Sequence, residues 1–122
     1  VWSYSLGMMS DWSGAAVAGD TVYVGNREND FYALNTVDGS IRWQFEAEDW
    51  AVTDPVVASD VVYVGVGNHD RREGPRPLYA LDASSGELLW MFRAATRVLD
   101  SPAVADGAVY IVTIGGEVYA LE

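Results

Sequence analysis

The chain has 122 residues and no cysteine, which excludes disulfide frameworks, cysteine-based metal sites and thiol nucleophiles. Half of the residues are hydrophobic, which predicts one folded domain, yet no apolar run approaches the roughly 18 residues that insert into a bilayer. The formal net charge is −11, from 18 acidic side chains against 7 arginines and no lysine. This charge repels the phosphates of nucleic acids and of anionic lipids, so we expect neither nucleic acid binding nor membrane insertion.

Short apolar runs follow in chain order, each rich in β-branched or aromatic residues and bounded by Gly, Asp, Asn or Pro. A run around Trp2, VWSYS, comes first. The first unit then contains AAVAGD (15–20), TVYVG (21–25), FYALN (31–35) and IRWQF (41–45). The second contains PVVASD (55–60), VVYVG (61–65), LYALD (78–82) and LLWMF (88–92), and the third contains PAVADG (102–107), AVYIV (108–112) and VYALE (118–122). Such runs are typical of β-strands joined by tight hairpins.

The runs repeat at a nearly fixed distance. Tyr23, Tyr63 and Tyr110 occupy the same place in each unit and are 40 and 47 residues apart, a difference that one seven-residue insertion in the second unit explains. Several runs are apolar without alternation, which indicates strands covered on both faces. Four-stranded sheets that repeat at this spacing are β-propeller blades. We therefore predict an all-β fold: a partial β-propeller of about three antiparallel blades. The units span about 15–45, 55–92 and 102–122, with an N-terminal strand at 1–6.

A second pattern places Ala, Gly and Trp at fixed spacing in ALNTVDGSIRW (33–43) and ALDASSGELLW (80–90). The glycine suits a turn that requires positive φ, and a tryptophan ring buries about 150 to 250 Å². We expect the alanine to leave a flat seat for an indole on the adjacent sheet, so that each tryptophan latches one blade to the next. The predicted blade-docking residues are Ala33, Gly39, Trp43, Ala80, Gly86, Trp90, Trp2 and Ala120.

The segments ALDASSGELLW, PAVADGAVYIV and GGEVYALE resemble the repeats of the pyrroloquinoline-quinone-like (PQQ-like) propeller superfamily, and the spaced pattern is similar to its tryptophan-docking motif. The resemblance covers almost the whole chain. The superfamily that the chain resembles includes proteins of diverse function, among them quinone-dependent dehydrogenases, an outer-membrane assembly scaffold and sensor domains of kinases. The resemblance therefore implies no single function. The acidic, lysine-free composition resembles that of haloarchaeal proteins, which implies a surrounding of high salt where charge repulsion is screened.

Enzymatic function can be judged on the residues that such dehydrogenases need. The resemblance implies a quinone beside a vicinal cysteine pair and a calcium ion, but the chain has no cysteine and no Asp-x-Asp-x-Asp-Gly loop. His69 is the only histidine, so neither a zinc site nor a Ser-His triad can be assembled. We predict no catalytic, cofactor-binding or metal-binding residue. The alternative is a fragment of a PQQ-dependent dehydrogenase whose cofactor and calcium ligands lie outside this chain.

Loops provide the candidate interaction sites. The insertion of the second unit carries three of the seven arginines, and two connecting loops carry Ser-Asp-Trp (10–12) and Glu-Asp-Trp (48–50). Loops on a rigid scaffold often carry binding, although the insertion can equally be a tolerated surface segment and the tryptophans can plug the propeller axis. The candidate interaction residues are Asp11, Trp12, Asp49, Trp50, His69, Arg71, Arg72 and Arg76.

These observations predict a non-enzymatic repeat module for protein interaction or scaffolding, and the family resemblance implies an extracytoplasmic location. Three blades are fewer than the usual 4 to 8 that close a ring. Either the chain is a piece of a larger propeller, which we favour, so that its partners are further blades of the same protein, or copies associate to complete the ring. In the second case the strand around Trp2 closes the third blade.

Overall fold

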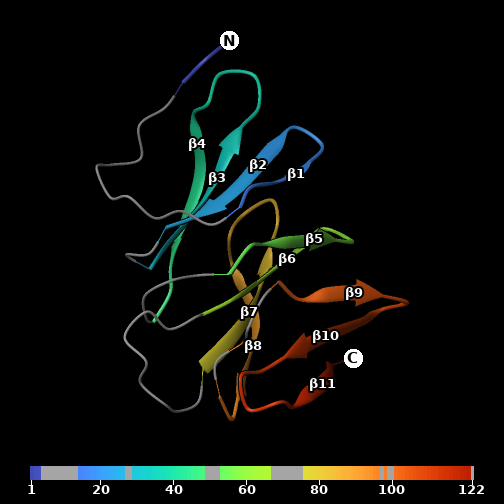
Figure 1. Cartoon of the computed structure of the whole chain (residues 1–122). Coiled ribbons are helices and arrows are strands. Elements are labelled where there is room, and N and C mark those ends of the chain that lie inside the picture. Colours follow the sequence, from blue (N-terminus) through green and yellow to red (C-terminus); the bar gives the residue numbers. More distant parts are fainter. Residues whose placement is uncertain are drawn as a thin grey trace.

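The computed structural model of the chain describes residues 1–3, 14–26, 29–48, 53–66, 76–96, 98 and 101–121. These residues form three antiparallel sheets whose strands pair in chain order (Figure 1). The first sheet contains β1 (Ala16–Ala18), β2 (Thr21–Gly25), β3 (Asp30–Asn35) and β4 (Ile41–Glu46). The second contains β5 (Val56–Ala58), β6 (Val61–Gly65), β7 (Arg76–Asp82) and β8 (Leu88–Ala94). The third contains β9 (Ala103–Ala105), β10 (Ala108–Val112) and β11 (Val118–Leu121).

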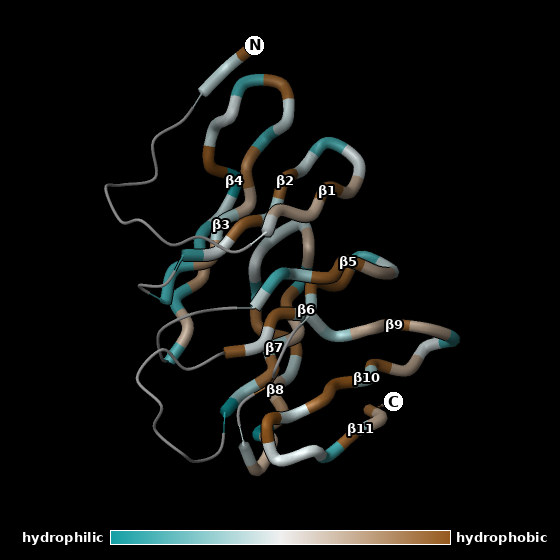
Figure 2. Tube along the Cα trace, viewed as in Figure 1, coloured by the Kyte–Doolittle hydropathy of each residue, from teal (hydrophilic) through white to brown (hydrophobic). Residues whose placement is uncertain are grey.

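The first hairpin of each sheet depends on residues that accept positive φ. In the first sheet Gly19 supplies it, with φ of 59°, and in the third sheet Asp106 and Gly107 supply it together, with φ of 51° and 78°. In the second sheet Ser59 and Asp60 adopt φ of 50° and 63°, as the two central residues of a type I′ turn do. Apolar residues are concentrated in the strands, and polar residues occupy several of the turns (Figure 2).

The hydrophobic cores lie between the sheets. One core joins Tyr23, Phe31, Ala33, Trp43 and Ala47 to Val62, Val64, Val66, Tyr79 and Leu81. The other joins Leu78, Ala94 and Val98 to Val109 and Ile111. The second sheet therefore contributes to a core on each of its faces, which is the physical reason why the run from Val61 to Val64 is apolar without alternation.

The three sheets stack so that their first strands are neighbours: β1 contacts β5, and β5 contacts β9. Each sheet begins at this inner strand and proceeds outward to β4, β8 or β11. The predicted all-β architecture of antiparallel sheets packed face to face is confirmed. In the described ranges, no helix has the length and hydropathy needed to cross a membrane.

The two edges of each sheet differ in their connections. Neighbouring strands run in opposite directions. The β1–β2, β3–β4, β5–β6 and β7–β8 hairpins therefore all lie at the same end of the strands, and we call this end the hairpin edge. The chain passes from β2 to β3, and from each sheet to the next, at the opposite edge. This loop edge includes the described residues 26, 29–30, 46–48, 53–54, 65–66, 94–96 and 113–117.

Candidate functional site

The junction between the first two sheets is built around Trp43. Its indole Nε1 donates a hydrogen bond of 2.9 Å to the carbonyl oxygen of Ala83, in the β7–β8 hairpin of the next sheet. The ring lies so close to Gly86 that a Cβ added there would be 2.6 Å from the indole Cδ2. Gly86 also has a φ of 75°, so the turn conformation and the ring contact both require glycine at this position.

Tyr23 completes the same junction. Its ring centroid is 5.8 Å from that of Trp43, and its hydroxyl donates to the Ala83 carbonyl oxygen at 3.1 Å. The Tyr23 hydroxyl is protonated at neutral pH and so is a donor, and burial raises its pKa further above its ordinary value. One carbonyl of the second sheet thus receives two donors from the first.

Trp2 makes an equivalent contact one sheet earlier. Its Nε1 donates to the carbonyl oxygen of Thr36 at 2.6 Å, and its ring occupies the space where Gly39 would carry a Cβ. Thr36 and Gly39 stand in the β3–β4 hairpin at the positions that Ala83 and Gly86 take in the β7–β8 hairpin. The tryptophan-to-hairpin contact therefore occurs twice with the same geometry.

The alanines of the spaced pattern lie elsewhere than expected. Ala33 is the cross-strand partner of Trp43, and Ala80 is the partner of Trp90, so each alanine lies beside the tryptophan of its own sheet. The seat on the adjacent sheet is formed by the hairpin glycine and by the carbonyl three residues before it, because only a residue without a side chain lets the indole reach the backbone. The expectation of an alanine seat on the adjacent sheet is corrected accordingly.

The remaining predicted docking residues are Trp90 on β8 of the second sheet and Ala120 on β11 of the third. Trp90 is 38% exposed, against 8% for Trp43, although its ring lies 5.9 Å from Tyr63 in the same way that Trp43 lies near Tyr23. Ala120 pairs with Tyr110 within the third sheet. A groove of about 340 Å³ follows this boundary between β8 and β11, and it is lined by Trp90, Met91, Phe92, Ala120 and Leu121.

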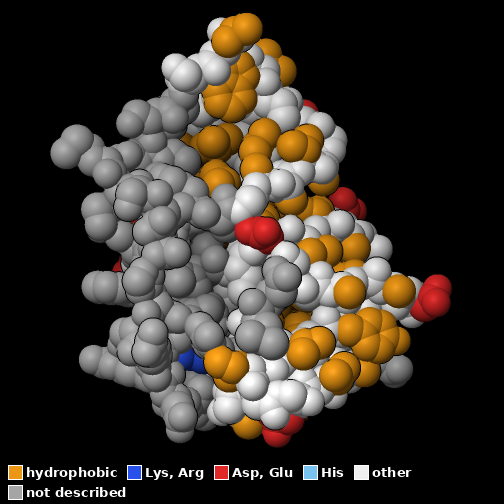
Figure 3. Space-filling model, in the orientation of Figure 1, with side chains coloured by type: hydrophobic (Ala, Val, Ile, Leu, Met, Phe, Trp, Pro, Cys, Tyr) orange, Lys and Arg blue, Asp and Glu red, His pale blue; other side chains and the backbone are white. Residues whose placement is uncertain are grey.

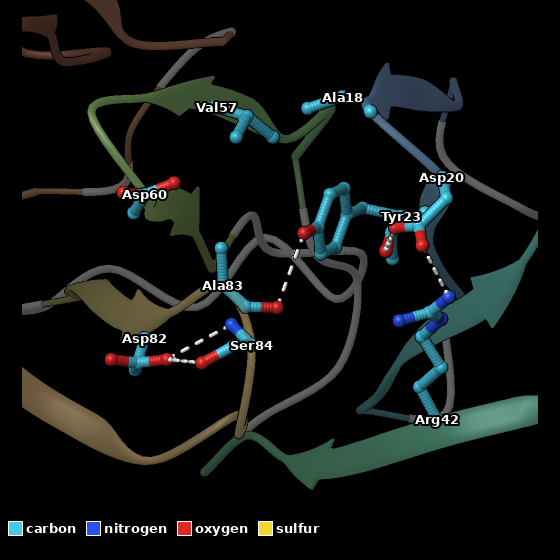
Figure 4. A pocket seen from close by; sticks show the side chains of 11 residues that line it. Ala18, Asp20, Tyr23, Arg42, Val57, Asp60, Asp82, Ala83 and Ser84 are labelled. Atoms are coloured by element: carbon cyan, nitrogen blue, oxygen red, sulfur yellow. Dashed lines mark hydrogen bonds and ion pairs between the residues drawn. The ribbon is translucent and has the colours of Figure 1, made fainter.

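A larger groove of about 570 Å³ opens on the hairpin edge between the first two sheets (Figure 4). It is lined by Ala18, Gly19, Asp20, Thr21, Tyr23, Arg42, Val57, Asp60, Asp82, Ala83 and Ser84. Its three carboxylates come from three different hairpins. Among the described residues, no group of three His, Cys, Asp or Glu side chains is arranged to hold a metal ion.

Two of these carboxylates have local partners that hold them ionised. Arg42 donates to Asp20 at 2.8 Å, and this hydrogen bond and charge lower the pKa of Asp20. The hydroxyl and backbone N–H of Ser84 donate to Asp82 at 2.6 and 2.9 Å, which lowers the pKa of Asp82. These contacts hold the turns in shape. The carboxylates that line the groove form an acidic rim around the Trp43 junction.

The loop edge carries a second set of anchors that sequence reasoning missed. The backbone N–H of Ala47 donates to the Asn29 carbonyl at 2.7 Å, and the Asn29 amide donates back to the Ala47 carbonyl at 2.9 Å. Arg93 of the second sheet donates to both carboxylate oxygens of Glu48, at 2.6 and 2.7 Å. These contacts fix the base of the connection between the first and second sheets.

The structure describes one of the eight predicted interaction residues. Asp11, Trp12, Asp49, Trp50, His69, Arg71 and Arg72 lie outside the described residues. Arg76 is described as the half-buried first residue of β7.

Stacked antiparallel sheets joined by repeated tryptophan-to-hairpin contacts define a segment of a β-propeller of PQQ-like repeats. A family model described as "Outer membrane protein assembly factor BamB" matches residues 1–73 and 71–122. The chain belongs to this family of PQQ-like repeat proteins, as its motifs predicted.

Individual relatives agree with this assignment. Outer membrane protein assembly factor BamB of Salmonella typhimurium is 37% identical over 67 residues, which are 48% of this chain and 17% of that protein. The structure of quinohemoprotein alcohol dehydrogenase ADHIIG from Pseudomonas putida HK5 is similar, with a TM-score of 0.76 and 26% identity over 98% of this chain and 20% of that chain. BamB from Moraxella catarrhalis shares the fold, with a TM-score of 0.71 and 22% identity over 88% of this chain and 32% of that one.

These similarities confirm the predicted partial propeller. The matched region spans 17% of the curated relative and no more than 32% of the two solved chains. The relatives also differ in kind, since one is named an assembly factor and another a dehydrogenase. Fold membership alone does not decide between a scaffold and an enzyme.

Proposed function

We propose that the chain is a non-enzymatic module for protein interaction or scaffolding, and that its loop edge is the binding side. The observation that carries the proposal is the way in which the described loop bases are fastened to the sheets. Asn29 and Ala47 exchange two hydrogen bonds, and Glu48 is joined to Arg93 of the next sheet. Loops with fixed ends lose less conformational freedom on binding, so more of the contact energy appears as affinity.

A further anchor supports the same side. The N–H of Gly65 donates to the Thr53 hydroxyl at 2.9 Å, and the N–H of Thr53 donates to the Gly65 carbonyl at 2.7 Å. This exchange fastens the entry to the second sheet just as Asn29 and Ala47 fasten the exit from the first. In the sequence, Trp50 lies between Ala47 and Thr53, and Arg71 follows Gly65; tryptophan and arginine are among the residue types most often dominant at protein interfaces.

The relatives support the scaffold role and an extracytoplasmic location. The curated relative in Salmonella typhimurium is named an assembly factor for outer membrane proteins. Such a role needs a rigid surface that contacts other proteins. We propose the same kind of role for this chain, with a protein partner or further blades of its own propeller as the bound surface.

A second candidate is a fragment of a PQQ-dependent dehydrogenase. The observation that favours it is the similarity to a quinohemoprotein alcohol dehydrogenase over 98% of this chain. In that case the quinone and the calcium ligands come from outside the chain. Titration with PQQ and Ca²⁺, followed by quenching of tryptophan fluorescence, separates the two: saturable binding at micromolar quinone supports the enzyme, and no binding supports the scaffold.

Site-specific photocrosslinking tests the binding side directly. A photoreactive amino acid replaces Ala95, which is exposed at the loop edge, or Glu87, which is exposed at the hairpin edge and serves as the matched control. In cells that produce the protein, we expect discrete protein adducts from position 95 and few from position 87. Equal adducts from both positions, or adducts from 87 alone, would contradict the proposal.

A further inference from the structure

The connection that leaves the first sheet is fastened to the second sheet at Glu48 by two contacts of different kinds. The backbone N–H of Glu48 donates to the hydroxyl of Tyr79 at 3.0 Å, and Tyr79 is 2% exposed. The carboxylate of Glu48 accepts from Arg93 at 2.6 and 2.7 Å, and these two side chains are 50% and 46% exposed. One contact is therefore neutral and buried, whereas the other is charged and open to solvent.

The neutral contact recurs where the chain leaves the second sheet. Phe45 packs edge-on against Tyr79, with ring centroids 5.0 Å apart. Phe92 packs in the same way against Tyr119, with ring centroids 5.1 Å apart. The hydroxyl of Tyr119 is hydrogen-bonded to the backbone of Ala95. The exit from each of the first two sheets is thus held by a tyrosine of the sheet that follows.

The charged contact has no counterpart at Ala95. This residue follows Phe92 by three positions, just as Glu48 follows Phe45, so the two exits correspond. The methyl side chain of Ala95 cannot accept a hydrogen bond from an arginine. The two exits therefore share the tyrosine contact and differ in the ion pair, which gives the molecule an internal comparison.

The ion pair responds to salt in the opposite direction from the chain as a whole. On the face shown in Figure 3, acidic side chains are exposed at several separate places, whereas arginine covers a small area. Because the net charge is −11, most charge interactions in the chain are repulsive, and salt relieves them. The interaction of Arg93 with Glu48 is attractive, and salt weakens it because both groups are exposed to the screening ions.

We propose that Glu48 and Arg93 form a clasp that loosens as the ionic strength rises, while the tyrosine contact keeps the exit from the first sheet in place. This exit then opens more often in concentrated salt than in dilute salt. The exit at Ala95, which has the tyrosine contact without an ion pair, does not change in this way.

The consequence for binding rests on the loop-edge function proposed above. A connection that is clasped before a partner arrives loses less conformational freedom on binding. The connection after Glu48 should therefore contribute most to affinity at low ionic strength. The clasp itself can be measured without a partner.

Hydrogen exchange of backbone amides, followed by NMR, measures the opening of each exit. The exchange rate of an amide that opens locally follows the equilibrium between its closed and open states. An exposed ion pair shifts such an equilibrium by about two- to fivefold. Between 0.1 and 1 M NaCl, we therefore expect the exchange rate of the Glu48 amide to rise by about two- to fivefold relative to that of the Ala95 amide, which is the control within the same molecule.

Arg93→Gln tests whether this pair causes the salt response. At 0.1 M NaCl the Glu48 amide of this variant should already exchange about two- to fivefold faster than in the wild type, with no further rise in 1 M NaCl. Arg42→Gln is the matched control, because it removes the same charge but breaks a pair with Asp20 at the hairpin edge. Its Glu48 amide should exchange as in the wild type at both salt concentrations.

Several outcomes would overturn the clasp. One is a Glu48 exchange rate that stays level or falls relative to that of Ala95 as salt rises. Others are a salt response that persists in Arg93→Gln or that disappears in Arg42→Gln. These outcomes are distinct from failure of the proposed binding side, since an absence of protein adducts from position 95 would leave the salt response of Glu48 unchanged.

Discussion

Trp43 on β4 and Tyr23 on β2 of the first sheet share one acceptor: both donate to the carbonyl oxygen of Ala83, at 2.9 and 3.1 Å. The shared acceptor makes the two donors partial substitutes for each other. Tyr23→Phe should cost about 0.5 to 1.5 kcal/mol, because the Trp43 indole still satisfies the carbonyl. Tyr23→Phe combined with Trp43→Phe should cost more than the sum of the single changes, since it leaves the carbonyl without a donor.

A double-mutant cycle in urea measures this coupling. We expect an interaction energy of about 0.5 to 1.5 kcal/mol between the two positions. Tyr119→Phe in the third sheet removes a hydroxyl that donates to Glu117, and in combination with Tyr23→Phe it should be additive. Additive behaviour of the Tyr23 and Trp43 changes would show that the acceptor is not shared in solution.

Stability should fall in acid partly through Asp82. The Ser84 hydroxyl and N–H lower the pKa of Asp82 below the usual 3.8, so the ionised form is favoured in the folded chain. Its contribution is therefore complete above about pH 3.8 and is lost as the pH falls below that value, through the folded-state pKa. Asp20 and Asp38 have lowered pKa values too, so the whole chain loses stability in the same direction.

Asp82→Asn isolates the contribution of this one carboxylate, because asparagine can still accept the turn hydrogen bonds but does not titrate in this range. In urea unfolding between pH 6 and pH 2.5, the difference between wild type and variant should shrink as the pH falls. A difference that stays constant across this range would rule out linkage through Asp82.

Salt should raise the stability of the folded chain. The net charge of −11 causes self-repulsion, and the Debye length falls from about 10 Å at 0.1 M to about 3 Å at 1 M salt. The midpoint of thermal unfolding should therefore rise between these concentrations, and to the same extent in NaCl and KCl. Measurement at several protein concentrations keeps association out of the comparison. A midpoint that is flat or that falls with salt would contradict the adaptation to high salt inferred from composition.

Much of the Trp43 junction could be predicted because its parts have sequence signatures. The spacing from Ala80 through Gly86 to Trp90, repeated from Ala33, predicted both the turn glycine and a tryptophan that reaches the next sheet. The prediction placed the indole contact at the alanine because alanine and glycine both leave room for a ring. The spacing does not reveal which of the two lies on the adjacent sheet, opposite the tryptophan. The β3–β4 register, in which Ala33 pairs with Trp43, decides this question.

Other parts of the site have no side-chain signature. The hydrogen-bond acceptors are the backbone carbonyls of Ala83 and Thr36, and every residue type has a backbone carbonyl. Only the position of both residues, three after the alanine of the motif, could have indicated these acceptors. Glu48 and Arg93 are 45 residues apart, and in a chain with 18 acidic residues no pattern distinguishes that pair from the rest.

The most direct test of the tryptophan-to-hairpin junction compares two glycines of similar φ. Gly86 and Gly107 have φ of 75° and 78°, but a Cβ at Gly86 would be 2.6 Å from the Trp43 ring, whereas no atom lies within 4 Å of a Cβ at Gly107. The free energy of unfolding in urea should fall by about 1 to 2 kcal/mol for Gly107→Ala, from the positive φ alone. For Gly86→Ala it should fall by about 1 to 3 kcal/mol more, from displacement of the indole, with a red shift of tryptophan fluorescence. Equal losses for the two variants, with unchanged fluorescence, would contradict the claim that Trp43 latches the first sheet to the second.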